Sequence, residues 1–115
     1  MRHHRANRKF GRVKKVRTAL LKSLAYALIK EGKIVTTEAK AKELRPMIER
    51  LITNAKANTL ASRRLLAPKL GIEASGKLLK EIAPKYIDRK GGYTRVTKVG
   101  PRVKDAAPMA QIEFV

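Results

Sequence analysis

The sequence lacks cysteine and tryptophan altogether, and aromatic residues make up only 4% of it. Without cysteine there is no disulfide bond, no thiol nucleophile and no cysteine-ligated zinc, which fits a reducing compartment. The two histidines, His3 and His4, are adjacent and offer a poor metal site, and no base is paired with a nucleophile. We therefore expect no metal, no cofactor and no enzymatic activity.

Acidic residues are also scarce. Asp and Glu number 9 against 28 Lys and Arg, which gives a formal net charge of +19, and the first acid is Glu31. Repulsion on this scale disfavours the compact state of an isolated chain, and a polyanionic partner relieves it. Nucleic acid is the first candidate, because Lys and Arg release the counterions of its phosphates. An anionic membrane surface is the alternative.

Long apolar stretches are missing as well. No stretch approaches the length needed to cross a bilayer, and no apolar segment near the start is typical of a secretion signal. The start is rich in arginine, as transit peptides are, but the first serine is Ser23, which argues against such a peptide.

The distribution of charge predicts one domain with a tail. A chain of 115 residues suits a single domain. Residues 1–12 contain five Lys or Arg and no acid, with too few apolar side chains to offset the entropy of ordering them. We expect an extended basic tail over 1–12, ordered only on a partner, and a single domain over 13–115. A solvated tail without a function is the alternative.

Hydrophobic periodicity predicts the first elements of the domain. From about Val13 apolar residues recur every three or four positions, which predicts a helix that ends at Gly32. The β-branched run over 33–37 predicts a strand. Thr37 then caps a second helix, which is expected to reach about Ala57.

The rest of the chain changes from helical to extended character. The segments are a helix over 59–67 capped by Asn58, a short helix capped by Ser75 and ending near Pro84, and strands over 93–99 and 109–115. The predicted order is α-β-α-α-α-β-β. We therefore expect an α+β fold in two layers, with about four helices against one face of a small three-stranded sheet.

Basic residues in the tail, on helices and between residues 85 and 104 are candidate RNA contacts. Arginine and lysine on an extended or loop segment can follow a phosphate backbone and stack on unpaired bases. The candidates are Arg2, His3, Arg5, Arg8, Lys9, Arg12, Lys14, Lys15, Arg17, Lys40, Arg63, Arg64, Arg89, Lys90, Gly91, Gly92, Tyr93, Arg95, Lys98 and Arg102. For the helical positions, a merely solvated face is the alternative. The Tyr93 ring can stack on a base or pack in the core, and the sequence leaves both open.

Seven short segments follow one another in a recognisable order. They are Met1-Arg2-His3, Ile34-Val35-Thr36-Thr37, Lys40-Ala41-Lys42-Glu43-Leu44-Arg45, Leu51-Ile52-Thr53-Asn54-Ala55-Lys56, Arg63-Arg64, Gly91-Gly92-Tyr93-Thr94-Arg95, and Ala107-Pro108-Met109-Ala110 with Ile112-Glu113. Together they resemble the L-seventeen family of bacterial large-subunit ribosomal proteins, and the likeness covers nearly the whole chain.

The resemblance implies a fold, a place and a ligand. The fold would be a two-layer domain with a mixed three-stranded sheet. The place would be the solvent side of the large ribosomal subunit, near the exit of the peptide tunnel, with the L-thirty-two family among the neighbouring proteins. The ligand would be large-subunit ribosomal RNA, contacted by the basic tail and the region from Gly91 to Arg95.

Three other classes of function share the charge. A DNA-binding architectural protein is disfavoured because no helix shows a long basic recognition face or a heptad seam. A membrane-active cationic protein using the first helix is disfavoured because Gly32 and the strand after it place that helix in a folded core. An RNA-processing enzyme finds no acid–base pair and no metal cluster to support it.

Overall fold

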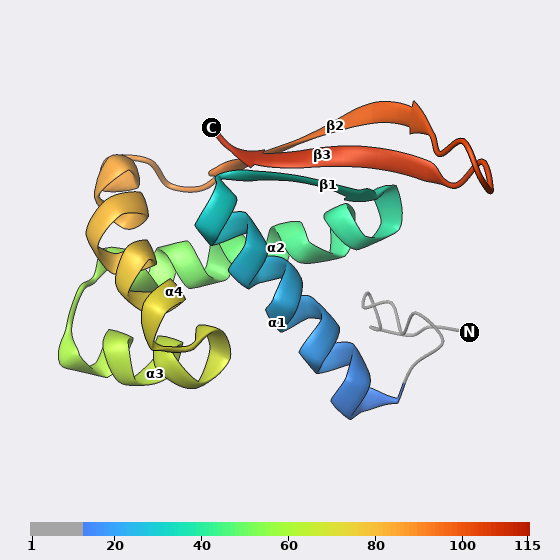
Figure 1. The fold of residues 1–115 in the computed structure, drawn as a ribbon. Coiled ribbons are helices and arrows are strands. Elements are labelled where there is room, and N and C mark those ends of the chain that lie inside the picture. The colour runs from blue at the N-terminus through green and yellow to red at the C-terminus, as the bar shows by residue number, and fades with distance from the viewer. Residues whose placement is uncertain (1–12) are drawn as a thin grey trace, which may run out of the picture.

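The computed structural model describes residues 13–115, and the tail predicted over residues 1–12 lies outside this range. In chain order the elements are α1 (Lys14–Glu31), β1 (Lys33–Thr37), α2 (Glu38–Lys56), α3 (Leu60–Leu70), α4 (Ile72–Lys77), the π-helical turn η1 (Leu78–Ile82), the 3-10 turn η2 (Ala83–Tyr86), β2 (Thr94–Pro101) and β3 (Pro108–Phe114). The strands form one sheet, and the helices all lie on one side of it (Figure 1). The α+β fold predicted from the sequence is confirmed.

The sheet has the strand order β1-β3-β2, and both pairs are antiparallel. Ile112 of β3 lies opposite Ile34 on one side and Val96 on the other. The mixed sheet that the resemblance implied is therefore wrong for this chain. The two strands that run in the same direction, β1 and β2, are separated by β3 and do not pair.

The core lies between the sheet and α2. Along β3 the side chains alternate, so that Ala110 and Ile112 are fully buried against the helices while Gln111 and Glu113 lie on the open face. The apolar stripe of α2 is at most 2% exposed, and it consists of Ala41, Leu44, Ile48, Leu51, Ile52 and Ala55. Full burial of each large aliphatic side chain contributes about 1.5–3 kcal/mol, so a mostly aliphatic core can stabilise a chain with few aromatic residues.

The ends of the first two helices follow the sequence signals. Gly32 ends α1 with a φ of 84°, a left-handed conformation that costs glycine little, and its N–H donates to the Leu28 carbonyl at 2.7 Å. Thr37 caps α2 by accepting a hydrogen bond from the Lys40 N–H at 3.3 Å. Both predicted boundaries are confirmed.

The boundaries of the next two helices differ from the prediction. Thr59 and not Asn58 caps α3, because Asn58 has a φ of 49° while Thr59 has the extended backbone that a cap requires. The helix also continues through Pro68 to Leu70. Ser75 does not cap α4, which begins at Ile72; its hydroxyl instead donates back to the Ile72 carbonyl at 3.1 Å.

Candidate nucleic-acid interface

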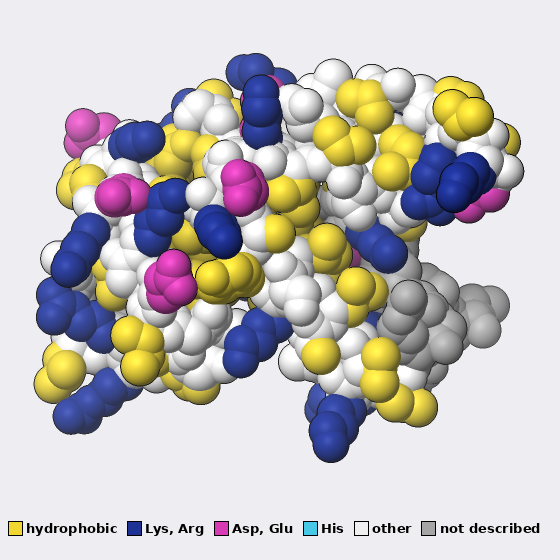
Figure 2. All heavy atoms as spheres, in the orientation of Figure 1, with side chains coloured by type: hydrophobic (Ala, Val, Ile, Leu, Met, Phe, Trp, Pro, Cys, Tyr) yellow, Lys and Arg dark blue, Asp and Glu magenta, His cyan; other side chains and the backbone are white. Residues whose placement is uncertain are grey.

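Basic side chains are spread over the domain and do not form one patch. Figure 2 shows Lys and Arg at the helical end of the molecule, at the lower end of α1 and at the tip of the hairpin between β2 and β3, with fewer acids among them. The predicted tail contacts Arg2, His3, Arg5, Arg8, Lys9 and Arg12 lie outside the described residues. The remaining basic candidates fall into two groups, according to whether an acid neutralises them.

Three of the candidates are held in ion pairs. Arg95 lies 3.5 Å from Glu113 across the β2–β3 pair, and Lys98 lies 3.8 Å from Glu38. Arg102 makes two hydrogen bonds with the carboxylate of Asp105, at 2.9 and 2.8 Å, at the hairpin tip. The basic side chains of these pairs are exposed, so each pair contributes little stability and an RNA phosphate can replace the acid at small cost.

The Arg102–Asp105 pair gives a prediction for pH. The Arg102 guanidinium, helped by the Ala107 N–H, lowers the pKa of Asp105 from 3.8 to about 2. A lowered pKa means that the pair stabilises the hairpin fully above pH 3.8 and is lost as the pH falls through about 2. An NMR titration of the carboxyl group should show this pKa, and Arg102→Ala should move it up toward 3.8. A carboxyl that titrates near 3.8 in the intact chain would contradict the pairing.

Eight other candidates make no ion pair with any residue of the described range. They are Lys14, Lys15, Arg17, Lys40, Arg63, Arg64, Arg89 and Lys90. Arg63 makes only a long contact, 3.5 Å, with the side-chain oxygen of Asn58. Most of these side chains are exposed, so their charge is available to a partner in solution.

The ring of Tyr93 is packed in the core. It is 1% exposed, lies 5.2 Å from the ring of Tyr86 in a tilted arrangement, and its hydroxyl donates to the Arg89 carbonyl at 3.0 Å. Of the two interpretations left open by the sequence, the structure adopts the packed one, which leaves no ring face for a base. Gly91 and Gly92, with φ of 142° and 64°, turn the chain ahead of it through conformations that cost glycine little.

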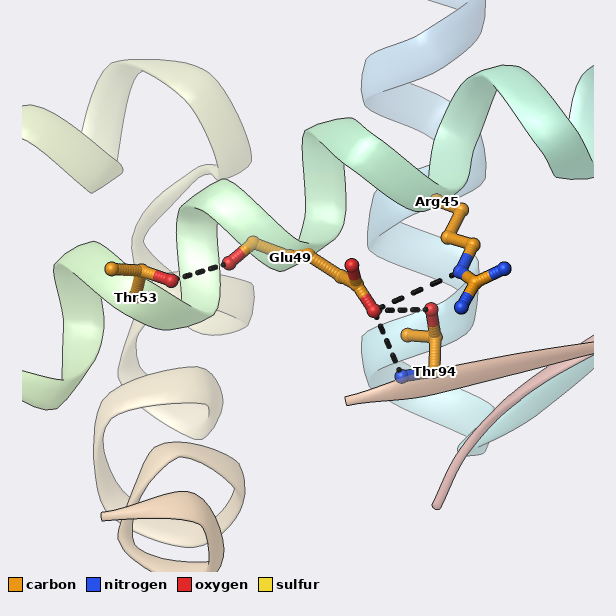
Figure 3. Close-up of polar contacts among 4 residues, drawn as sticks. All are labelled: Arg45, Glu49, Thr53 and Thr94. Carbon is orange, nitrogen blue, oxygen red and sulfur yellow. Dashed lines mark hydrogen bonds and ion pairs between the residues drawn. The ribbon is translucent and has the colours of Figure 1, made fainter. Parts of the chain in front are cut away.

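Helix α2 holds both ends of the loop formed by residues 89–94, which we call the 89–94 loop. At one end the Lys56 ammonium donates to the Arg89 carbonyl and to the Tyr93 hydroxyl, and this lowers the pKa of Tyr93. At the other end one carboxylate oxygen of Glu49 accepts from the N–H and the hydroxyl of Thr94, at 3.3 and 3.2 Å (Figure 3). The loop that presents Lys90 is thus fixed before any partner binds.

Glu49 is placed for this role by its neighbours on α2. Its carboxylate lies 3.8 Å from the Arg45 guanidinium, and its backbone carbonyl accepts a hydrogen bond from Thr53 at 3.0 Å (Figure 3). The spacing of Arg45 and Glu49 is visible in the sequence, but the contact with Thr94 is not, since the two residues are brought together only by the packing of β2 on α2.

A second group of basic residues could not be recognised from the sequence. Lys22 of α1, Arg50 of α2 and Lys69 of α3 line one hollow of about 330 Å³, which we call the three-helix cleft. None of the three was singled out, because each is an ordinary surface cation on its own helix. Only the packing of three helices brings them around one space.

Proteins similar to this chain establish its family. A family model described as "Ribosomal protein L17" matches residues 20–115, which is most of the chain. The chain belongs to the ribosomal protein L17 family. A relative named large ribosomal subunit protein bL17, from Campylobacter lari, is 55% identical over the whole of this chain and 99% of its own length. Relatives of the same name from Gemmatimonas aurantiaca and Sphingopyxis alaskensis are each 51% identical over the whole chain and cover 98% and 84% of their own lengths.

Membership of the L17 family confirms the resemblance found in the seven segments. It makes the chain a structural component of the large ribosomal subunit, in the cytoplasm as part of the ribosome, and not an enzyme. Its partners are accordingly ribosomal RNA and other ribosomal proteins. Within residues 13–115 no helix combines the length and the apolar character that a membrane span needs.

Proposed function

We propose that this L17-family chain binds large-subunit ribosomal RNA with its basic tail and with the exposed cations of the domain. The observation that carries the proposal is the set of eight candidate cations that make no ion pair within residues 13–115, in a chain of net charge +19. Cations that the fold does not neutralise gain most from phosphate, because each contact releases a condensed counterion.

The contacts divide by their physical role. Residues 1–12 and the start of α1, with Lys14, Lys15 and Arg17, would follow the RNA backbone, and Arg63 and Arg64 would add contacts from α3. The 89–94 loop would present Arg89 and Lys90, with Gly91 and Gly92 allowing close approach of the backbone. Tyr93 would support this loop from inside the core and would not stack on a base.

The position within the subunit is a further part of the proposal and rests on the family resemblance alone. We place the chain near the exit of the peptide tunnel, with a protein of the L-thirty-two family as a neighbour. Cross-links from lysines on the domain to that neighbour in intact large subunits would support the placement, and their absence, with cross-links to other proteins only, would refute it.

The RNA-binding proposal is tested with a tagged copy of the full chain expressed in a bacterial cell. Lysate is sedimented through a sucrose gradient, before and after a high-salt wash. We expect the chain to sediment with large subunits and to leave them only in strong salt, since phosphate contacts weaken as salt rises. A chain that binds duplex DNA as tightly as large-subunit RNA would favour the architectural DNA-binding alternative.

A further inference from the structure

The three-helix cleft has features of a binding site in its own right. We infer that it takes a single unpaired nucleotide of ribosomal RNA, with the phosphate held by its three cations and the base placed against its apolar floor. The inference rests on the proposed RNA binding, and it adds a site separate from the tail and from the 89–94 loop.

The cations of the cleft come from three different helices. Lys22, Arg50 and Lys69 all line it, and no Asp or Glu does. None of the three forms an ion pair with another residue of the part of the chain that the structure describes. Like charges that converge without an acid between them favour an anion in the space they share. Arg50 adds a planar group that can grip phosphate with two parallel hydrogen bonds.

The remaining lining suits a base rather than a bare ion. Met47, Leu51 and Pro68 form an apolar floor, and Thr18 and Asn54 provide polar groups beside it. The side chains of Thr18 and Asn54 make no hydrogen bond to another residue within 13–115, so their donors and acceptors are available to a base edge or a ribose hydroxyl. A volume of about 330 Å³ lies in the usual range for small-ligand sites.

The shape of the molecule keeps this space open. In Figure 2 the surface is hollowed between the lobe that contains α3 and the lower half of α1, and a basic side chain lies at the edge of the hollow. Helix α2 crosses α1 above this hollow (Figure 1), and Met47, Arg50, Leu51 and Asn54 of α2 line the cleft. Unpaired nucleotides that are turned out of their stack are the usual targets of sequence-specific RNA binding, and a cleft open on one side can receive them.

The first test removes the charge of the cleft without filling it. The triple variant Lys22→Ala, Arg50→Ala, Lys69→Ala is compared with Lys30→Ala, Lys33→Ala, Lys80→Ala, which loses the same charge elsewhere on the domain. Binding of each full chain to large-subunit ribosomal RNA is measured against salt. We expect the cleft variant to bind about tenfold more weakly than the control, and its salt slope to fall by about 1–2 more, as loss of one or two phosphate contacts requires. Equal losses in the two variants would overturn the inference.

The second test uses the absence of cysteine from the chain. A Thr18→Cys variant carries a photoactivated cross-linker on its only thiol and is assembled into large subunits, with Thr97→Cys on the open face of the sheet as the control. We expect the label at position 18 to join a ribosomal RNA nucleotide that the control does not reach. Cross-linking of position 18 to another ribosomal protein would overturn the inference. If the unmodified chain failed to bind the RNA at all, the proposed function itself would fall.

Discussion

Deletion of residues 1–12 is expected to weaken binding to large-subunit ribosomal RNA by on the order of 10³-fold at about 0.15 M salt. The segment contains five Lys or Arg and no acid. Each phosphate contact adds about 0.7–0.9 to the slope of log affinity against log salt, so the slope should fall by about 3.5–4.5 if all five act. Filter binding of the full and shortened chains over a range of salt concentrations measures both quantities.

The matched control for this deletion keeps the length of the tail and removes its charge. A full chain in which Arg2, Arg5, Arg8, Lys9 and Arg12 are all changed to Gln should lose nearly as much affinity as the deletion. Thermal unfolding of both variants should match that of the intact chain, because the helices and the sheet of the described residues form a hydrophobic core among themselves. A shortened chain that binds with an unchanged salt slope would show that the tail does not contact phosphate.

Replacement of Glu49 is expected to have the largest effect of any polar substitution on the stability of the domain. Thr94 is 3% exposed, and both its N–H and its hydroxyl donate to the same Glu49 oxygen. Glu49→Ala leaves two buried donors without a partner, and each costs about 1–3 kcal/mol. We therefore expect a loss of about 2–6 kcal/mol in the free energy of unfolding, measured by urea denaturation, with faster hydrogen exchange at the Thr94 amide.

Two further variants separate this effect from the loss of an ion pair. Arg45→Ala removes the exposed partner of Glu49 at 3.8 Å and should cost no more than about 1 kcal/mol. In a Thr94→Val background one of the two donors is already gone, so Glu49→Ala should cost less than it does in the natural sequence. If Arg45→Ala and Glu49→Ala cost the same, the contact with Thr94 contributes nothing.

The elements that the sequence predicted well carry strong local signals. A helix that ends at Gly32, a β-branched strand after it and a helix that begins at Thr37 each depend on neighbouring residues only. The alternation of Ala110 and Ile112 with polar residues likewise predicted which face of the last strand is buried. At such places local propensity and tertiary packing agree.

The errors arise where packing decides between local alternatives. Asn58 and Thr59 are both good caps, and the left-handed backbone at Asn58 settles the choice. The helix predicted over 59–67 continues through Pro68 to Leu70, which is 2% exposed, so burial at its last turn offsets the hydrogen bond that proline cannot make. The antiparallel sheet is a matter of topology, which no short segment specifies.

The candidate site was predictable in its charge and not in its geometry. Runs of Lys and Arg are visible in any sequence, and they indicated a polyanionic partner correctly for a member of the L17 family. The acid partners of Arg95 and Lys98, the burial of Tyr93 and the convergence of three helices on one cleft depend on residues far apart in the chain. Only the folded structure brings these together.

The central position of β3 has a consequence for the chain while it is being made. Synthesis delivers β1 early, but its only partner in the sheet comes last in chain order, since Lys33 pairs with Glu113. Until then β1 is an unpaired strand with an uncovered Ile34, the kind of edge on which nascent chains aggregate. A chain of net charge +19 repels other copies of itself during this interval. We therefore expect the charge that is proposed to bind RNA in the finished particle also to hinder aggregation of the incomplete chain.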